Sequence, residues 1–287
     1  MSGMAGDEAR LSGGVAVITG AGSGIGAGLA RRAGALGMTV VVTDVDLAAA
    51  QSVANEIVDS GGKAHAMAVD VSRFDELDRL AENVFARFGA VRLLINNAGI
   101  ETLGYCWEIP AERWEKTLRT NLHGVIHGVR AFVPRMLTSG AECWIANLAS
   151  IGSFGIMPTQ SAYMVTKHAV QSFTENLFLE LQIKGAPIQV SSVIPGAVRT
   201  GIFSSAQGKD EPADAEGYRA AMDAMLQDHG MGVEAASTLI MQGIAAGQFW
   251  VSTQPEVTGE MIAGRVAYLQ DQSDPPLSNQ TRALLGL

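Results

Sequence analysis

Short apolar runs alternate along the chain with segments that have the apolar spacing of helices. Runs such as VAVIT and IQVSSVI are β-branched and almost uniformly apolar, which is typical of strands buried on both faces of a sheet. The strands expected from this pattern are residues 15–19, 38–44, 64–71, 91–96, 142–150, 188–194 and 249–253. The helices expected between them begin at Ile25 and Leu47 and then cover residues 73–88, 111–138 and 161–183. This alternation predicts a doubly wound α/β fold, with a mostly seven-stranded parallel sheet and helices on both faces.

Neither a Pro- or Ser-rich linker nor a fixed-period repeat divides the sequence, so we expect one domain over residues 1–287. Residues 1–12 precede the first strand as an N-terminal tail. Residues 201–232 mix Gly, Pro and acidic residues, and an irregular segment of that length is either disordered or a functional lid. Two methionines three residues apart within it favour a substrate lid with an adaptable apolar face. Residues 254–287 form a C-terminal extension with a helix-like beginning.

Composition and charge exclude several classes of protein. Hydrophobic residues make up 47% and charged residues 17% of the chain, which predicts a large core rather than disorder. The net charge of −9 would repel a polyphosphate backbone, so nucleic acid is excluded as a partner. Cys106 and Cys143 form neither a disulfide framework nor a metal-ligand pair, and they favour a reducing cytoplasm. No apolar run reaches the length of a membrane span, and we expect no signal peptide.

A glycine-rich turn, TGAGSGIG at residues 19–26, lies directly after the first expected strand and at the start of the first helix. Glycines there permit positive φ and remove Cβ atoms, so backbone N–H groups and the helix N-terminus can approach a diphosphate. Alone, the turn is also compatible with an ordinary tight connection. The second strand ends in Asp44, close to the ~20-residue offset expected for an acid that binds ribose. The two features together predict a Rossmann fold that binds a dinucleotide.

Asp44 also bears on which dinucleotide is bound. Its carboxylate would accept hydrogen bonds from the adenosine 2′-hydroxyl and would repel a 2′-phosphate. No Lys or Arg stands in the glycine turn or at positions 45 and 46 to compensate. The sequence therefore favours NAD over NADP, while a turn-capping role for Asp44 remains the alternative interpretation.

Tyr163 and Lys167 are spaced i, i+4 at the start of a long expected helix, so both side chains project from one face. A free phenol, with a pKa of about 10, is a poor base at neutral pH. A neighbouring ammonium and an oxidised nicotinamide would both favour the phenolate.

Taken together, these segments resemble the short-chain dehydrogenase/reductase family. The segments that carry the resemblance are TGAGSGIG (19–26), NNAG (96–99), Asn121, Ser150, YMVTK (163–167) and PGAVRT (195–200), in the family's order and spacing. The resemblance runs from about residue 13 to residue 202 and implies the NAD-type family with an Asn-Ser-Tyr-Lys tetrad.

The resemblance implies a role for each member of this tetrad. Tyr163 would be the general acid/base, and Lys167 would lower its pKa and hold the nicotinamide ribose. Ser150 would polarise the substrate oxygen, and Asn121 would anchor a proton-relay water. The cofactor-binding residues implied are Gly20, Ser23, Gly24, Ile25, Gly26, Asp44, Asp70, Val71, Asn97, Ala98, Gly99, Tyr163, Lys167, Pro195, Gly196, Val198 and Thr200.

A substrate pocket is expected from residues that follow the strands on the carboxyl side of the sheet. They are Glu101, Trp107, Ser153, Phe154, Met157, Ile202, Phe203 and Met222. Most are apolar, and no Arg or Lys cluster is present for a phosphate or carboxylate. The pocket therefore favours a bulky hydrophobic or aromatic secondary alcohol and its ketone.

Further expectations concern metals, assembly and alternative functions. His123 and His127 have a metal-capable spacing but lack a third ligand, so no metal is expected. A homodimer or homotetramer is expected through the helices at 111–138 and 161–183. The prediction of a tetramer is weaker, because the C-terminus departs from the DGG-like tail that many members of the family have. The sequence thus predicts an NAD-dependent oxidoreductase. A 3-oxoacyl thioester reductase and a non-catalytic dinucleotide-sensing protein are the alternatives.

Overall fold

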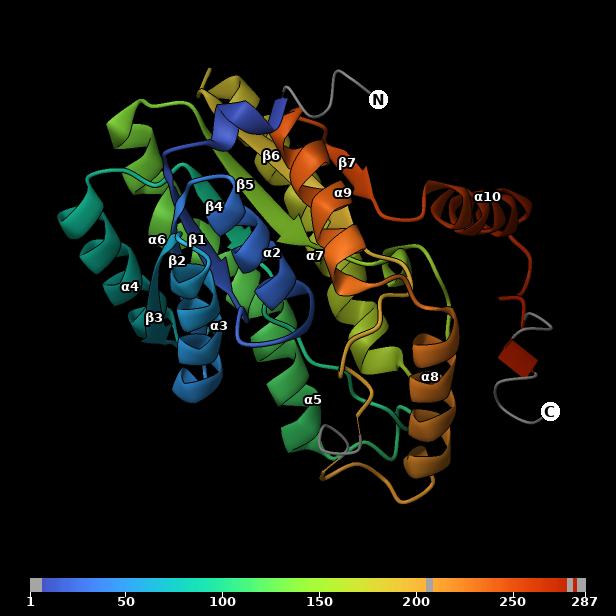
Figure 1. Cartoon of the computed structure of the whole chain (residues 1–287). Helices are drawn as coiled ribbons and strands as arrows, with labels where there is room; N and C mark the ends of the chain where they lie inside the picture. Colours follow the sequence, from blue (N-terminus) through green and yellow to red (C-terminus); the bar gives the residue numbers. More distant parts are fainter. Residues whose placement is uncertain (1–6, 205–208, 278–280, 283–287) are drawn as a thin grey trace.

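Seven parallel strands form one sheet in the order β3-β2-β1-β4-β5-β6-β7 (Figure 1). The computed structural model describes residues 7–204, 209–277 and 281–282. The strands are β1 (Val15–Thr19), β2 (Thr39–Asp44), β3 (Lys63–Ala68), β4 (Leu93–Asn96), β5 (Cys143–Leu148), β6 (Ile188–Ile194) and β7 (Trp250–Ser252). The predicted seven-stranded parallel sheet is confirmed. The strand order reverses between β1 and β4, and at such a point the carboxyl ends of the strands leave a crevice for ligands.

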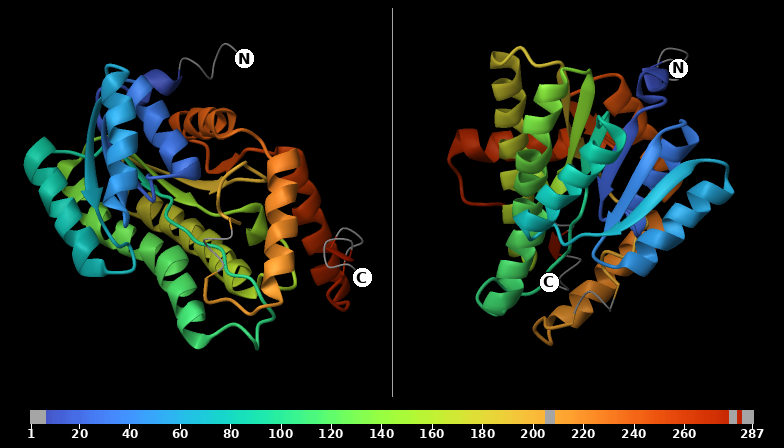
Figure 2. Two further views of the ribbon diagram at one scale, coloured as in Figure 1. Left: turned by 60° about the horizontal axis from the view of Figure 1, so that its bottom comes forward. Right: turned by 90° about the vertical axis from the view of Figure 1, so that its left-hand side faces the viewer.

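Helices cover both faces of the sheet (Figure 2). One core cluster joins the sheet to α2 (Gly24–Ala35), α3 (Leu47–Asp59) and α9 (Val233–Ala245). The other joins it to α4 (Phe74–Phe88), α6 (Gly124–Ser139) and α7 (Ser161–Ile183). Because both faces are covered, β1, β4 and β5 are buried at every position. This burial is why their sequences are continuous apolar runs rather than alternating ones.

The helix expected over residues 111–138 consists of three consecutive pieces. They are α5 (Ala111–Leu118), a π-helical segment η2 (Arg119–His123) and α6, which continues to Ser139. Segments of π-helix are rare and occur frequently at functional sites. The apolar pattern predicted the helix but not the change in its winding.

The chain ends differ from the expected tail and extension. Residues 8–11 form a short helix, η1 (Glu8–Leu11), in which Leu11 belongs to the core and Glu8 pairs with Arg32. The expected tail is therefore partly built into the domain, and its residues 1–6 lie outside the described part. The extension begins with α10 (Pro255–Asp271), which projects from the body beside the sheet (Figure 1).

The expected lid region is more regular than its composition indicated. Within residues 201–232, α8 (Ala215–His229) is a helix of four turns, and residues 205–208 lie outside the described part. A further short helix, η3 (Ile151–Ser153), follows β5. Among the described residues, no helix has the length and apolar character needed to cross a bilayer.

Candidate active site

A cavity of about 1480 Å³ opens where the carboxyl ends of the strands meet. It is larger than the ~300–1,000 Å³ of common small-molecule pockets, so it has room for two ligands side by side. Every residue expected to bind the cofactor lines this cavity, from Gly20 after β1 to Thr200 after β6. The topology thus brings together segments that are far apart in the sequence.

The glycine turn after β1 is shaped for close approach of a ligand. Gly20 and Gly24 have φ angles of +62° and +52°, in the region that favours glycine. A Cβ on Gly26 would lie 2.2 Å from the carbonyl oxygen of Gly20. Asn97 fixes the turn to the end of β4, because its Nδ2 donates to the carbonyl oxygens of Thr19 and Gly20 at 2.8 and 3.0 Å. The N-terminus of α2 therefore presents backbone N–H groups to the cavity, and this cradle fits a diphosphate.

Asp44 stands at the end of β2, where the adenosine ribose of a dinucleotide would lie. Its Oδ2 accepts a hydrogen bond from Gly22 N–H at 2.9 Å, and its Oδ1 accepts from Asp46 N–H at 3.0 Å. These bonds orient the carboxylate, which lines the cavity. The turn-capping role considered from the sequence is therefore present, and the carboxylate still faces the ligand space.

Asn121 lies on the π-helical segment and is fully buried. Its Nδ2 donates to the carbonyl oxygen of Ile100 and its Oδ1 accepts from Ile100 N–H, both at 2.8 Å. Nδ2 also donates to Thr166 Oγ1 at 3.2 Å. Asn121 therefore joins the loop after β4 to α7, the helix that contains Tyr163 and Lys167.

The other three residues of the expected tetrad meet inside the cavity. Tyr163 and Ser150 both line the cavity, Ser150 is close enough to lower the pKa of the Tyr163 phenol, and Ser150 Oγ accepts from Gly152 N–H at 3.0 Å. Lys167 Nζ donates to the carbonyl oxygen of Leu148 at 2.8 Å and lies 5.5 Å from the centre of the Tyr163 ring. Two hydroxyls and an ammonium thus converge at one end of the cavity.

Burial dominates the electrostatics of this cluster. It raises the pKa of Tyr163 above its ordinary value, the charge of Glu101 raises it further, and the hydrogen bond from Ser150 opposes the shift. Burial lowers the pKa of Lys167 from 10.5 to about 8, and Glu101 partly offsets this change. The side chains alone therefore shift the pKa of Tyr163 in the opposite direction to that expected from the sequence, because burial raises this pKa more than the Ser150 hydroxyl lowers it.

The expected substrate pocket needs two corrections. Glu101, Phe154, Met157, Ile202, Phe203 and Met222 line the cavity. Trp107 does not: its side chain is 75% exposed and stacks on Tyr105, with ring centres 5.1 Å apart. Ser153 does not either, because its hydroxyl turns inward and donates to the carbonyl oxygen of Lys167 at 2.8 Å. Ser153 therefore binds the backbone of α7.

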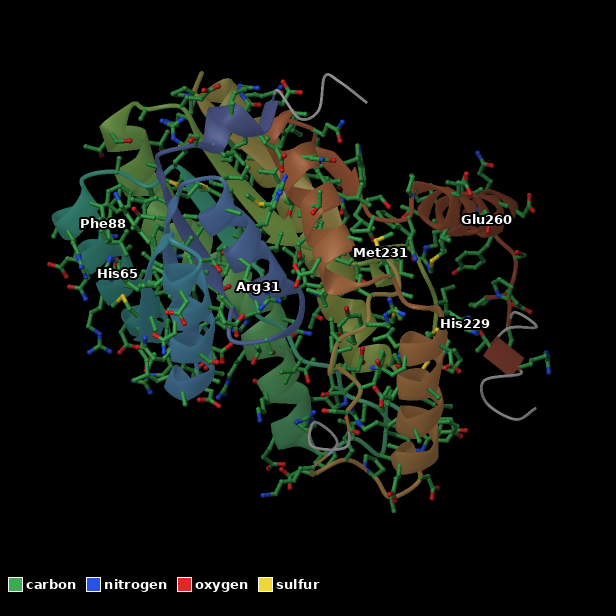
Figure 3. The ribbon with its side chains drawn as sticks, viewed as in Figure 1. Arg31, His65, Phe88, His229, Met231 and Glu260 are labelled. Atoms are coloured by element: carbon green, nitrogen blue, oxygen red, sulfur yellow. The ribbon has the colours of Figure 1, made fainter. Side chains whose placement is uncertain are left out.

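Sequence reasoning missed the contribution of α10 to the cavity. Val257, Met261, Gly264 and Tyr268 line it, and Figure 3 labels Glu260 on the same helix. These positions follow the i, i+4, i+7, i+11 spacing of one helix face. The spacing could have predicted an apolar helix face here, but it does not show which part of the protein that face meets.

A buried ion cluster holds the lid region to the loop after β4. Arg219 on α8 binds Glu211 through two hydrogen bonds, and the two side chains are 5% and 3% exposed. Glu211 also accepts from Leu103 N–H at 2.8 Å, and Arg113 Nη2 lies 3.6 Å from Glu211 Oε1. Arg113 in turn donates to the carbonyl oxygen of Glu101 at 2.9 Å. No sequence signal separated Glu211 from the solvated acids around it.

The histidine pair packs against neighbouring elements. His127 Nδ1 lies 3.0 Å from the carbonyl oxygen of Val71, and the rings of His123 and His127 are 6.0 Å apart. Within the described ranges, no group of three or more His, Cys, Asp or Glu side chains could hold a metal ion.

Comparison with known proteins agrees with this geometry. The family model for short chain dehydrogenases matches residues 14–211, more than half of the chain. The chain belongs to the short-chain dehydrogenase/reductase family. Members of the family that resemble this chain have been solved in complex with NAD and with NADP.

Individual relatives show how far the similarity extends. The chain is 32% identical over 231 residues to "Probable oxidoreductase EphD" of Mycobacterium tuberculosis, covering 79% of this chain and only 38% of that protein. It is 37% identical over 191 residues to a cyclohexanol dehydrogenase of Acinetobacter sp. strain SE19, covering 66% and 75% of the two chains. A short-chain dehydrogenase/reductase from Burkholderia phymatum, solved in complex with NAD, superposes with a TM-score of 0.86 at 33% identity and covers 94% of this chain and 99% of that one.

Proposed function

We propose that this protein interconverts a bulky hydrophobic or aromatic secondary alcohol and its ketone, with NAD(H) as the hydride carrier. The observation that carries the proposal is the meeting of the Tyr163 and Ser150 hydroxyls in the cavity that also contains the glycine turn and Asp44. One end of the cavity thus suits a dinucleotide, and the other offers proton chemistry beside an apolar space.

The nicotinamide ring would supply or accept the hydride, and its positive charge in the oxidised state favours the phenolate. Tyr163 would remove the alcohol proton, or return it to the ketone oxygen. Ser150 would donate a hydrogen bond to the same oxygen. The Ser150 hydroxyl is held in place because it accepts a hydrogen bond from Gly152 N–H. Lys167, anchored on the carbonyl oxygen of Leu148, would add positive charge near the phenol and bind the ribose.

Asp44 supports the choice of NAD. Its carboxylate is oriented by two backbone N–H groups, and no arginine or lysine stands at positions 45 and 46. A 2′-phosphate would meet a negative charge there, whereas a 2′-hydroxyl would donate to it. Asp44→Ala should raise the ratio of kcat/KM for NADP to that for NAD at least tenfold. An unchanged ratio would contradict the role of Asp44.

The apolar substrate end supports the alcohol class. Phe154, Met157, Ile202, Phe203 and Met222 offer hydrocarbon surface, to which α10 adds Val257 and Met261. The similarity to a cyclohexanol dehydrogenase points the same way.

We further propose a homodimer through α5, α6 and α7. Val165, Leu179 and Ile183 on α7 are 51%, 54% and 84% exposed, which is unusual for large apolar side chains on one helix. Light scattering at micromolar concentration should give a dimer or a multiple of it, and a monomer would refute the proposal.

The decisive experiment for the function is Tyr163→Phe. NADH formation should be measured over a panel of cyclic, aryl and aliphatic alcohols, with NADH binding followed by fluorescence. The variant should lose about 10²- to 10⁴-fold in kcat while it binds NADH as the parent does. Phe88→Tyr, at the C-terminal end of α4 and outside the cavity lining, is the control for the effect of changing one hydroxyl elsewhere in the protein. Turnover within tenfold of the parent would refute the role of Tyr163.

A further inference from the structure

Glu101 is a buried acid in the substrate part of the cavity. It follows the NNAG segment in the loop after β4, it is one of the residues that line the cavity, and it is only 1% exposed. It lies near enough to Tyr163 and Lys167 for its charge to act on both. The other side chains of the substrate part are mostly apolar, so Glu101 is the exception that needs a reason.

The surroundings of Glu101 favour its neutral form. Burial raises its pKa well above 4.5, and the negative charge of Glu211 acts in the same direction. The Thr102 N–H, Arg219 and Lys167 oppose the shift without reversing it. A neutral carboxyl also suits the reaction, because an ionised Glu101 would raise the pKa of Tyr163 and disfavour the phenolate.

The neutral carboxyl of Glu101 has an O–H group that needs a hydrogen-bond acceptor. Oε1 accepts from the Thr102 N–H at 3.1 Å. In the part of the chain that the structure describes, this is the one hydrogen bond made by the carboxyl, and no protein acceptor meets its O–H. A buried donor without an acceptor is unfavourable, so an oxygen acceptor on a ligand in the cavity would stabilise the neutral carboxyl.

We propose that Glu101 is a specificity-determining residue that donates a hydrogen bond to a second oxygen of the substrate, one that takes no part in hydride transfer. The inference rests on the proposed function and narrows its substrate class to secondary alcohols and ketones that carry an additional ether, hydroxyl or carbonyl oxygen. A substrate ammonium group would instead need the carboxylate form, which burial disfavours.

The test compares ligands that differ in one atom. Ketones with a methoxy substituent at ring position 2 or 3 of cyclohexanone are paired with the matching ethyl compounds, which have CH₂ in place of the oxygen. Calorimetry measures their dissociation constants, and kcat/KM is measured for the corresponding alcohols with NAD. At least one methoxy compound should be favoured over its ethyl partner by about ten- to a hundredfold in both measurements.

Variants assign this preference to Glu101. Glu101→Gln retains an acceptor for Thr102 N–H and an N–H donor, so it should keep the preference. Glu101→Met has similar size without a donor and should lose it. Glu108→Gln and Glu108→Met are matched controls, because Glu108 is an exposed acid of the same loop outside the cavity lining. They should leave the preference unchanged.

The outcomes separate this inference from the proposed function. Turnover of the alcohols without an oxygen preference would overturn the role of Glu101 and leave the function intact. A preference in ketone binding without any turnover would support Glu101 and count against the function. A preference that persists in Glu101→Met, or stronger binding of 2-aminocyclohexanone than of its methoxy analogue, would also overturn the inference. If Glu101→Met does not fold, the lack of an oxygen preference in the parent protein or in Glu101→Gln would still overturn the inference.

Discussion

Arg219→Met removes the cation that holds Glu211 in the buried ion cluster between α8 and the loop after β4. Breaking a buried pair from one side costs about 3–5 kcal/mol, because the remaining charge is uncompensated. Here the cost should lie near the lower end, since Leu103 N–H still donates to Glu211 and Arg113 stays 3.6 Å away. We expect a loss of about 3 kcal/mol in the free energy of unfolding, or roughly 6 °C in Tm for a chain of this size.

Urea unfolding and calorimetry measure this effect, with Arg79→Met as the control. Arg79 pairs with Asp75 at the surface, where the side chains are 65% and 58% exposed, so its loss should cost no more than about 0.5 kcal/mol. The double variant R219M/E211Q removes the buried charge while keeping an acceptor for Leu103 N–H, and it should recover part of the loss. A cost of Arg219→Met below about 1 kcal/mol, or a double variant no more stable than the single one, would refute the reasoning.

Three further predictions concern the glycine turn and the buried titratable groups. Gly26→Ala should abolish NADH binding in a fluorescence titration, since its Cβ would lie 2.2 Å from the carbonyl oxygen of Gly20; Gly217→Ala, with open space around its Cβ, should leave binding unchanged. The pKa of Lys167 is lowered from 10.5 to about 8 in the native state, so between these pH values the unfolded state binds one more proton than the native state. The free energy of unfolding of the cofactor-free protein should therefore rise with pH in this range, by up to about 1.4 kcal/mol per pH unit relative to Lys167→Met. The pKa of Glu101 is raised, so the native state keeps a proton that the unfolded chain loses, and stability should fall as pH rises above 4.5 relative to Glu101→Gln. Equal pH profiles for parent and variant in urea unfolding would contradict either statement.

The sheet and the cofactor end of the cavity were predictable because their causes are local. A strand buried on both faces must be apolar along its length, as β1 shows, and a turn that approaches a diphosphate must be glycine at fixed positions, as Gly26 shows. Tyr163 and Lys167 lie one helical turn apart, so their common direction follows from the helix itself. These features are confirmed in the fold, while their chemical roles stay predictions.

The substrate end was predicted less well because it depends on contacts between distant segments. Trp107 follows the expected ligand region in sequence, but the loop turns its ring outward to stack on Tyr105. Glu211 lies among exposed acids and is buried only because Arg219 and Leu103 meet it there. The position of α10 at the cavity likewise depends on a long-range arrangement that no local spacing encodes.

The π-helical segment has a consequence for insertions and deletions in this part of the chain. Buried positions 113, 117, 121, 125 and 129 are all four residues apart, and each such step overshoots a turn of α-helix by about 40°. The π-helical winding around Asn121 has more residues per turn, and it compensates for this rotation. The five buried positions therefore stay on the same inward-facing side of α5, η2 and α6. Removing Arg119 or Thr120 would restore regular winding, rotate everything downstream relative to the sheet, and turn the Asn121 amide away from Ile100 without altering the asparagine itself.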